Sequence, residues 1–351
     1  MSQTTEFADT VRKFLSTSVT ASIREQVSKG DWPSSLWDPA AELGLTTIAV
    51  SEARGGVDFP LADVASVLFE AGRAAAPMPL GEAVLAELML AAAGVEAPGS
   101  FVAPFLPEPG TLTLERRGDQ LLATGVLVGV AWGRHASHVA VVASVDGTDV
   151  TVLIPVSTAL VKGDDLAGEP RDLIEFSGAT VSTGPAAGLS RDAAMLRGAW
   201  IKAVMMSGAM DGALEISIRY TKERVQFGKP IAAFQAVQQQ MAVFASQSAS
   251  ASAAAAGATD ALSLGNHELE VAMAKTRVGE AAGVAAAIAH QVHGAMGFTR
   301  EYALQHLTRR LWAWRDDYGS EVEWAQHIGS IVARLDGAAL WPLLTATEDG
   351  H

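Results

Sequence analysis

The stretch RYTKERVQFGKPI, residues 219–231, concentrates basic and aromatic side chains in a chain that is otherwise rich in alanine. Gly228 and Pro230 form a strong helix stop, because glycine accepts the left-handed backbone of a helix end and proline cannot continue the helix. Arg224 precedes that stop, where a cation complements the partial negative charge of the helix terminus. The same guanidinium can instead hold a diphosphate, with Phe227 packed beside a ring or sugar. The residues alone leave both interpretations open.

A second stretch, QVHGAMGF at residues 291–298, follows another long helical segment. Gly294 and Gly297 permit a tight turn and a close approach of the backbone to a ligand. A helix end followed by an ordinary turn explains the two glycines equally well. We interpret His293 as a surface or helix-cap residue, since a lone histidine is more often that than a ligand. Gln235, just after the first stretch, is a candidate for an amide contact to the same ligand.

The composition limits the class of protein. The chain has 351 residues, is 49% hydrophobic and carries a net charge of -14, which argues against a general nucleic-acid binder because a phosphate backbone would be repelled. An anionic ligand therefore needs a local basic pocket. The absence of cysteine excludes disulfides and thiolate metal sites, and we expect no bound metal. The sequence shows no signal-peptide pattern and no membrane-spanning stretch, so we expect a cytoplasmic protein.

Hydrophobic periodicity divides the chain into three predicted domains. Residues 1–99 show helical spacing and predict an N-terminal helical domain. Residues 100–187 predict a middle β-domain, because HVAVVASV and DVTVLIPV are rich in β-branched residues and Asp146 and Gly147 form a turn signal between them. Residues 188–351 predict a C-terminal helical bundle.

The bundle contains three long helical stretches, predicted over residues 192–226, 234–262 and 268–293. The tract SQSASASAAAAGA, residues 246–258, could be a low-complexity linker. We predict a bundle helix instead, because alanine is the best helix former and small side chains let helices approach closely. The order of helices, sheet and helices predicts an α protein with a small central β-domain and a C-terminal four-helix bundle.

The segments RYTKERVQFGKPIAAFQAVQ, QVHGAMGFTREYALQHLTRRLW and DDYGSEVE together resemble the acyl-CoA dehydrogenase family. AELGLTTIAVSEARGGVDFPLADVASVLFEAGR is similar to the first helices of that family, so the resemblance covers most of the chain and is weakest in the middle. It implies the family's fold, an acyl-CoA substrate, and an FAD held mainly by a neighbouring subunit while this chain clasps its pyrophosphate and adenosine. The cofactor-binding residues that the resemblance implies are Arg224, Gln226, Phe227, Phe234, Gln235, Gln291, Val292, Gly294 and Ala295.

The reaction implied by the resemblance is α,β-desaturation of an acyl-CoA, in which a glutamate removes the proton beside the thioester. That glutamate has two alternative places in the family, and this chain has Tyr318 in one and Gly198 near the other. We therefore expect no catalytic residue in this chain. Asp317 is the remaining candidate, but a shift of one loop position redirects a side chain, and we interpret it as a solvated carboxylate or a helix N-cap. Tyr318 is a poor base, since its reference pKa is about 10.

The middle region departs from the family as well. Trp132 echoes a family tryptophan that lies behind the flavin ring, but the hydroxyl and amide partners of the ring are missing from FVAPFLPEPGTLTL and GVLVGVAWGRHASHVAVVA. We interpret three tryptophans near DDYGSEVE as core or interface residues rather than as the lining of an acyl pocket. They are Trp312, Trp314 and Trp324.

These losses resemble the short subunit of actinobacterial heteromeric (α2β2) acyl-CoA dehydrogenases of steroid side-chain degradation. The resemblance implies a full-length acyl-CoA dehydrogenase partner that supplies the base, while this chain completes the FAD site. Two alternatives remain. In the first alternative, the chain is a self-sufficient homomeric dehydrogenase that uses Asp317. In the second, it is a flavin-free structural protein that kept only the scaffold.

Overall fold

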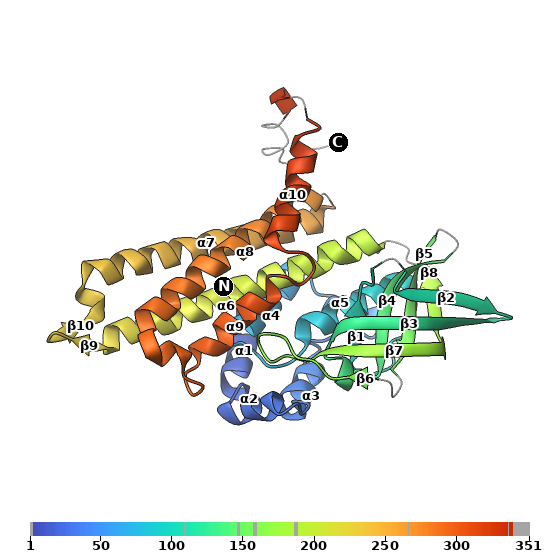
Figure 1. The fold of residues 1–351 in the computed structure, drawn as a ribbon, viewed down its shortest axis with the longest axis horizontal. Helices are drawn as coiled ribbons and strands as arrows, with labels where there is room; N and C mark the ends of the chain where they lie inside the picture. Colours follow the sequence, from blue (N-terminus) through green and yellow to red (C-terminus); the bar gives the residue numbers. More distant parts are fainter. Residues whose placement is uncertain are drawn as a thin grey trace.

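The structure is a computed structural model that describes residues 3–108, 110–145, 148–156, 160–185, 189–265, 267–335 and 337–339. The turn predicted at Asp146 and Gly147 lies outside the described residues. Among the described residues, helical segments precede and follow a β-rich region (Figure 1). The predicted fold class is confirmed.

The N-terminal part is helical, with its apolar face turned toward the rest of the molecule. Its helices are α1 (Gln3–Ser18), α2 (Ala21–Ser28), α3 (Ser34–Glu42), α4 (Leu61–Arg73) and α5 (Leu80–Ala93), with a 3-10 turn η1 (Glu52–Arg54) between α3 and α4. α4 packs against both α1 and the long helix α6 (Arg191–Glu223). Gly72 and Gly208 permit the close crossing of α4 and α6, because a Cβ on either would lie about 2 Å from a backbone carbonyl oxygen of the other helix.

The middle part contains two four-stranded sheets. One has the order β1 (Val102–Phe105), β4 (His138–Val145), β5 (Thr148–Pro155) and β8 (Ser182–Pro185). The other has the order β2 (Leu112–Arg117), β3 (Gln120–Ala131), β7 (Arg171–Thr180) and β6 (Leu160–Val161), and a 3-10 turn η2 (Gly133–His135) follows β3. The strands predicted from HVAVVASV and DVTVLIPV are confirmed as the antiparallel pair β4 and β5, with Val141 opposite Val152. Their inward side chains form a second hydrophobic core with Trp132 and Phe176.

The C-terminal part is a helical bundle. It comprises α6, α7 (Gln235–Leu264), α8 (Glu268–His293), α9 (Leu304–Trp314) and α10 (Glu321–Val332), with the short strands β9 (Val225–Gln226) and β10 (Lys229–Pro230) and the 3-10 turns η3 (Ile231–Ala233), η4 (Gly294–Phe298) and η5 (Gly337–Ala339). α6, α7 and α8 pack on one another, α9 packs on α6, and α10 packs on α8. The alanine-serine tract is helical, as predicted, and lies within α7. The first bundle helix ends at Glu223 rather than at Gln226, because the chain turns into the β9–β10 hairpin.

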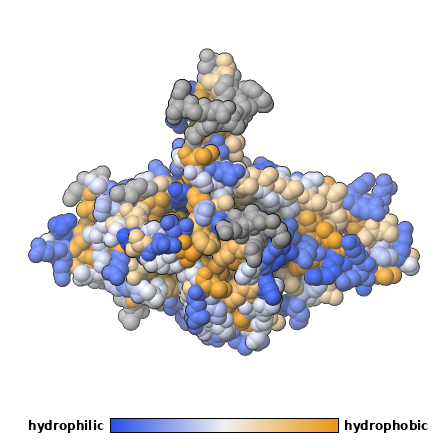
Figure 2. Space-filling view, turned by 180° about the vertical axis from the view of Figure 1, so that it is seen from behind, coloured by the Kyte–Doolittle hydropathy of each residue, from blue (hydrophilic) through white to orange (hydrophobic). Residues whose placement is uncertain are grey.

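Two features of the surface bear on partners. The edge along which α7 runs is coloured pale orange in Figure 2, as its alanine-rich sequence requires. No helix among the described residues is long and apolar enough to cross a membrane.

The division into domains after residues 99 and 187 stays a prediction.

Candidate functional site

The predicted cofactor-binding stretch forms a hairpin at one tip of the molecule, where α6 ends (Figure 1). The two residues of its turn, Phe227 and Gly228, have positive φ angles of 51° and 77°. Positive φ at both positions is the signature of a type I′ turn, which normally has asparagine and glycine there. For a phenylalanine this backbone costs about 1 kcal/mol or more. The strained aromatic is nevertheless 92% exposed, so burial in this chain does not explain it.

A cavity of about 340 Å³ joins this hairpin to the start of α7 and the end of α8. Its lining residues are Gln226, Phe227, Ile231, Phe234, Ala236, Val237, Gln240, Gln291 and Val292. The rings of Phe227 and Phe234 meet edge to face at 6.1 Å, and the Lys229 ammonium lies 4.5 Å from the centre of the Phe234 ring. We call this group of residues, together with Arg224, the clasp.

The clasp brings together five of the nine predicted cofactor-binding residues as cavity lining: Gln226, Phe227, Phe234, Gln291 and Val292. Arg224, Gln235, Gly294 and Ala295 adjoin the cavity along the chain without lining it. The sequence reasoning missed Ile231, Ala236, Val237 and Gln240. Ala236 and Val237 lie four and three residues before Gln240 on α7, and that helical spacing could have found them.

Arg224 is fixed by its backbone and free at its side chain. Its N–H donates to the carbonyl of Tyr220 at 2.8 Å, and its own carbonyl accepts from Ile231 N–H at 2.8 Å. The exposed guanidinium has no hydrogen bond or ion pair to any residue that the structure describes. Its donors therefore remain available to a ligand or partner that reaches this tip of the molecule.

The end of α8 supplies the other side of the clasp. Gln291 is exposed, and Gly294 has φ 58° and ψ −141°, a conformation that is open to glycine almost alone. His293 lies at the helix end, as the last residue of α8 and the N-cap of η4, but the expectation of a surface position was wrong, because its side chain is buried. Its ring stacks on Tyr220 of α6 at 4.3 Å, and Nδ1 lies 2.7 Å from the carbonyl oxygen of Ala289. His293 is thus a packing residue that joins α8 to α6 behind the clasp.

Tyr318 and Gly198, the residues at or near the two glutamate positions that the family resemblance implies, face each other in this chain. Tyr318 lies in the loop between α9 and α10, and Gly198 lies on α6. A Cβ built on Gly198 would stand 2.3 Å from Cδ1 of Tyr318, so the tyrosine ring occupies the space beside the glycine. Burial, together with the nearby Glu82, raises the pKa of Tyr318 and keeps its phenol neutral.

The loop that carries Tyr318 is held by buried polar contacts. Lys275 of α8 donates to the carbonyls of Arg315 and Gly319 at 2.6 and 2.7 Å. Trp324 of α10 donates from Nε1 to the carbonyl of Tyr318 at 2.9 Å. Burial lowers the pKa of Lys275 to about 8, although its three carbonyl contacts and nearby acids favour the charged form. The tyrosine is therefore positioned rigidly, in a left-handed backbone with φ 54°.

Asp317 forms the centre of a buried ion-pair chain rather than a solvated group. Its Oδ2 lies 2.7 Å from Arg171 Nη2 and 3.1 Å from Lys202 Nζ, and Lys202 also pairs with Glu82 at 2.6 Å. The side chain is only 17% exposed, and the N-cap of α10 is Ser320, so both expectations for Asp317 were wrong. Burial raises the pKa of Asp317, but the two cations outweigh it and bring the pKa to about 2.

A group of ion pairs follows Trp132 along the chain. This tryptophan is buried in the second core, and Arg134 two residues later pairs with Asp172 at 2.7 Å and with Asp164 at 3.0 Å. The segment before β7 continues toward α9, where Glu169 accepts hydrogen bonds from Arg310 and Trp314, each at 3.0 Å. Each of these acids has its cation within the chain.

Two of the three tryptophans near this loop are core residues, as expected. Trp314 is 2% exposed and Trp324 is 9% exposed. Trp312 is 42% exposed, and the guanidinium of Arg315 lies 5.0 Å from the centre of its ring.

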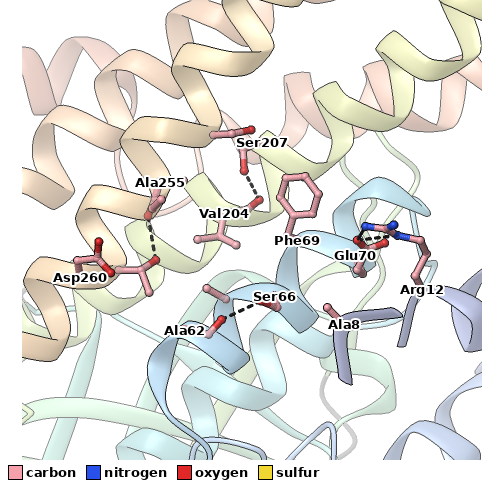
Figure 3. A pocket seen from close by; sticks show the side chains of 14 residues that line it. Ala8, Arg12, Ala62, Ser66, Phe69, Glu70, Val204, Ser207, Ala255 and Asp260 are labelled. Atoms are coloured by element: carbon pink, nitrogen blue, oxygen red, sulfur yellow. Dashed lines mark hydrogen bonds and ion pairs between the residues drawn. The ribbon is translucent and has the colours of Figure 1, made fainter. Parts of the chain in front are cut away.

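Another cavity, of about 350 Å³, lies between α1, α4, α6 and α7 (Figure 3). Its walls are mostly alanine, serine and threonine, with Phe69 as the one aromatic residue. Arg12 and Glu70 point toward each other at one side of it and pair at 2.7 Å. This cavity contains none of the predicted site residues.

Comparison with known proteins assigns the family. Residues 2–100 match the acyl-CoA dehydrogenase N-terminal domain, and residues 192–315 match the acyl-CoA dehydrogenase C-terminal domain. This chain belongs to the acyl-CoA dehydrogenase family. The resemblance predicted from the sequence motifs is therefore confirmed.

Individual acyl-CoA dehydrogenases agree with this assignment. "Acyl-CoA dehydrogenase IpdE2" of Mycolicibacterium smegmatis is 28% identical over 284 residues, which are 78% of this chain and 80% of that protein. A variant of the "Tcur3481-Tcur3483 steroid ACAD" has a TM-score of 0.85 at 23% identity, over 96% of this chain and 99% of that chain. The ChsE4-ChsE5 complex from Mycobacterium tuberculosis has a TM-score of 0.83 at 18% identity, over 96% of this chain and 99% of that chain. At these identities the two solved structures show the shared fold.

Proposed function

We propose that this chain is a subunit of a cytoplasmic FAD-dependent acyl-CoA dehydrogenase that completes the FAD site while a full-length partner supplies the catalytic base. The observation that carries the proposal is the contact of Tyr318 with Gly198. Both positions that the family uses for its glutamate are taken, one by a neutral phenol and the other by a residue with no side chain. A side chain at position 198 would meet the ring of Tyr318, so that position has no room for a carboxylate.

The state of Asp317 supports the same conclusion. A base that removes a proton beside a thioester needs a pKa near the working pH and a free oxygen aimed at the substrate. Asp317 has a pKa of about 2, and one of its oxygens already receives Arg171 and Lys202. The alternative of a self-sufficient enzyme that uses Asp317 is therefore disfavoured.

The clasp fits part of a flavin dinucleotide. Members of the acyl-CoA dehydrogenase family are FAD-dependent flavoproteins, and FAD when bound accepts the hydride of the desaturation. Arg224 has the charge and the unoccupied donors for a diphosphate, and the Phe227–Phe234 pair offers aromatic surface to a sugar or base. The glutamine amides at 226, 240 and 291 add donors and acceptors. In this role the chain binds and orients the dinucleotide and provides no proton acceptor.

The region beside Trp132 does not fit a flavin ring in the same way. Arg134 pairs with Asp172 at 2.7 Å, and Arg171, the residue before Asp172, pairs with Asp165 at 3.2 Å. Placing a ring at this position would require these buried pairs to separate, at a cost of several kcal/mol. We therefore propose one shared FAD per pair of unlike subunits in an α2β2 assembly. The solved relatives named as pairs, Tcur3481-Tcur3483 and ChsE4-ChsE5, lend support by their fold.

Copurification with a candidate partner tests the proposal. The chain alone should be colourless, and coexpression with a full-length acyl-CoA dehydrogenase should give a yellow complex that is active on an acyl-CoA. The flavin-to-subunit ratio of the complex should be one FAD for each chain of this kind. Flavin and activity in the chain alone would establish the homomeric enzyme. A chain that stays colourless with every candidate partner would establish the flavin-free scaffold.

A further inference from the structure

A strongly cationic cavity lies between α2, the segment that precedes β7, and α9, away from the hairpin tip that carries the clasp (Figure 1). Its volume is about 270 Å³. Asp164 is the one acidic residue among its lining residues. Its cationic lining residues are Arg24, Lys29, Arg134, Arg300, Arg309 and Arg310. Such a concentration is notable in a chain whose net charge is -14.

Half of these cations are neutralised by acids of the chain. The neutralised ones pair as Lys29 with Glu25 at 2.8 Å, Arg134 with Asp172 at 2.7 Å, and Arg310 with Glu169 at 3.0 Å. The other half, Arg24, Arg300 and Arg309, have no carboxylate within ion-pair distance among the residues that the structure describes, although Glu25 is near enough to interact with Arg300. The cavity therefore carries an excess of positive charge.

Two of the unneutralised arginines are held in place by neutral groups. Arg24 donates to the carbonyls of Ala74 and Ala75 at 2.8 and 3.1 Å. Arg309 donates through Nε to the carbonyl of Leu166 at 2.6 Å. These contacts orient the guanidinium groups without cancelling their charge, so a ligand that binds them does not have to order long side chains.

The neighbouring titratable groups respond to this charge. Burial, together with the positive charges of Arg24, Arg310 and Arg309, lowers the pKa of His306 to about 3. Burial and Arg310 lower the pKa of Arg24 to about 10. Both groups are thus placed where a further negative charge would be favourable.

We propose that this cavity binds a phosphate-bearing anion, with Arg24, Arg300 and Arg309 as its main ligands. A phosphate or diphosphate presents several oxygens, which the planar donors of arginine match in pairs. A single carboxylate would offset only one of the unneutralised charges. The volume equals that of roughly nine water molecules, which is ample for a diphosphate. The source of the anion is either free diphosphate or the phosphate end of a nucleotide.

Calorimetric titration with inorganic pyrophosphate at low ionic strength tests this site in the full chain, or in its complex if it purifies with a partner. Saturable binding is expected, and it should weaken as salt is added. Arg300→Gln and Arg309→Gln should each lower the affinity about ten-fold or more, because each removes a charge-assisted contact. Both side chains are exposed, so the fold should survive, and far-UV circular dichroism checks this.

Arg116→Gln is the matched control, an exposed arginine on β2 outside the cavity. Binding should be unchanged in this variant, and the difference between variants separates this cavity from phosphate sites elsewhere in a complex. Competition by 3′,5′-ADP would identify a nucleotide as the source, whereas binding of pyrophosphate alone would identify free diphosphate. The proposal is overturned if the wild type shows no saturable binding, or if Arg116→Gln loses as much affinity as Arg309→Gln.

Discussion

The clasp and the loop that carries Tyr318 differ in whether their charged and aromatic side chains are free or packed against the rest of the chain. In the clasp, the Arg224 guanidinium has no partner among the described residues and Phe227 is almost fully exposed. In the loop, Asp317 is paired twice and the ring of Tyr318 is packed against Gly198. A site whose groups are free in the isolated chain is suited to something that arrives from outside. A loop whose carboxylate is already paired with two cations of the same chain is suited to holding the structure together.

The largest expected effect comes from breaking the ion-pair chain at its centre. Lys202→Met should lower the free energy of unfolding by about 3–5 kcal/mol, because Glu82 loses its cation and Asp317 loses one of two in a buried place. Denaturant unfolding measures this. Lys222→Met, on the exposed end of the same helix, is the control and should change little. Equal stability of the two variants would mean that the loop does not depend on this network.

The clasp is expected to show its effect in cofactor retention rather than in stability. Arg224→Ala should weaken flavin retention in the complex by about 1.5–3 kcal/mol, since a charge-assisted contact to the diphosphate is lost. Flavin absorbance after gel filtration measures the retained fraction. Lys222→Ala, two residues earlier, is the control. Full flavin retention in Arg224→Ala would mean that this arginine only complements the end of the helix and does not hold the diphosphate.

The pH dependence of stability tests the role of Asp317. Its pKa is about 2 in the folded protein, against an ordinary value of 3.8, so the unfolded chain binds more protons between these values. The stabilisation is fully present above about pH 4 and is lost as the pH falls toward about 2, a loss of about 2 kcal/mol.

Urea unfolding over this pH range measures the loss, and Asp317→Asn should remove that part of the pH dependence. Asp119→Asn, an exposed site on the β2–β3 turn, should leave it unchanged. In the folded complex, Asp317→Asn should keep turnover nearly intact. A collapse of the rate in that variant would make Asp317 the base and overturn the proposed division of labour.

The smallest expected effect is on the stability of the hairpin turn, where a substitution of Phe227 separates the backbone strain of this residue from its role in binding flavin. Phe227→Asn should stabilise the isolated chain by about 1 kcal/mol, because asparagine before glycine suits a type I′ turn. The same variant should retain less flavin in the complex, since the exposed ring is lost. A thermal melt and the flavin ratio measure the two effects. A variant that gains stability and keeps its flavin would show that the ring is not needed at the clasp.

The sequence predicted the clasp better than it predicted the loop. Phe227, Gln226 and Phe234 lie within one short stretch, and Gly228 and Pro230 mark the end of α6 to within a few residues. The residues from α8 were found only because a second motif resembled a known family. The burial of His293, in contrast, was not predicted, because it depends on Tyr220 from another helix.

The sequence by itself determined where helices and strands form, where the first bundle helix stops, and which family the chain belongs to. Those features depend on local propensity, periodicity and short motifs, as the alanine-rich α7 and the β4–β5 pair show. Only the tertiary structure decided the roles of Asp317 and Tyr318. Arg171, Lys202 and Gly198 reach them from β7 and α6, and a pKa or a filled space is set by neighbours in three dimensions rather than by neighbours in the chain.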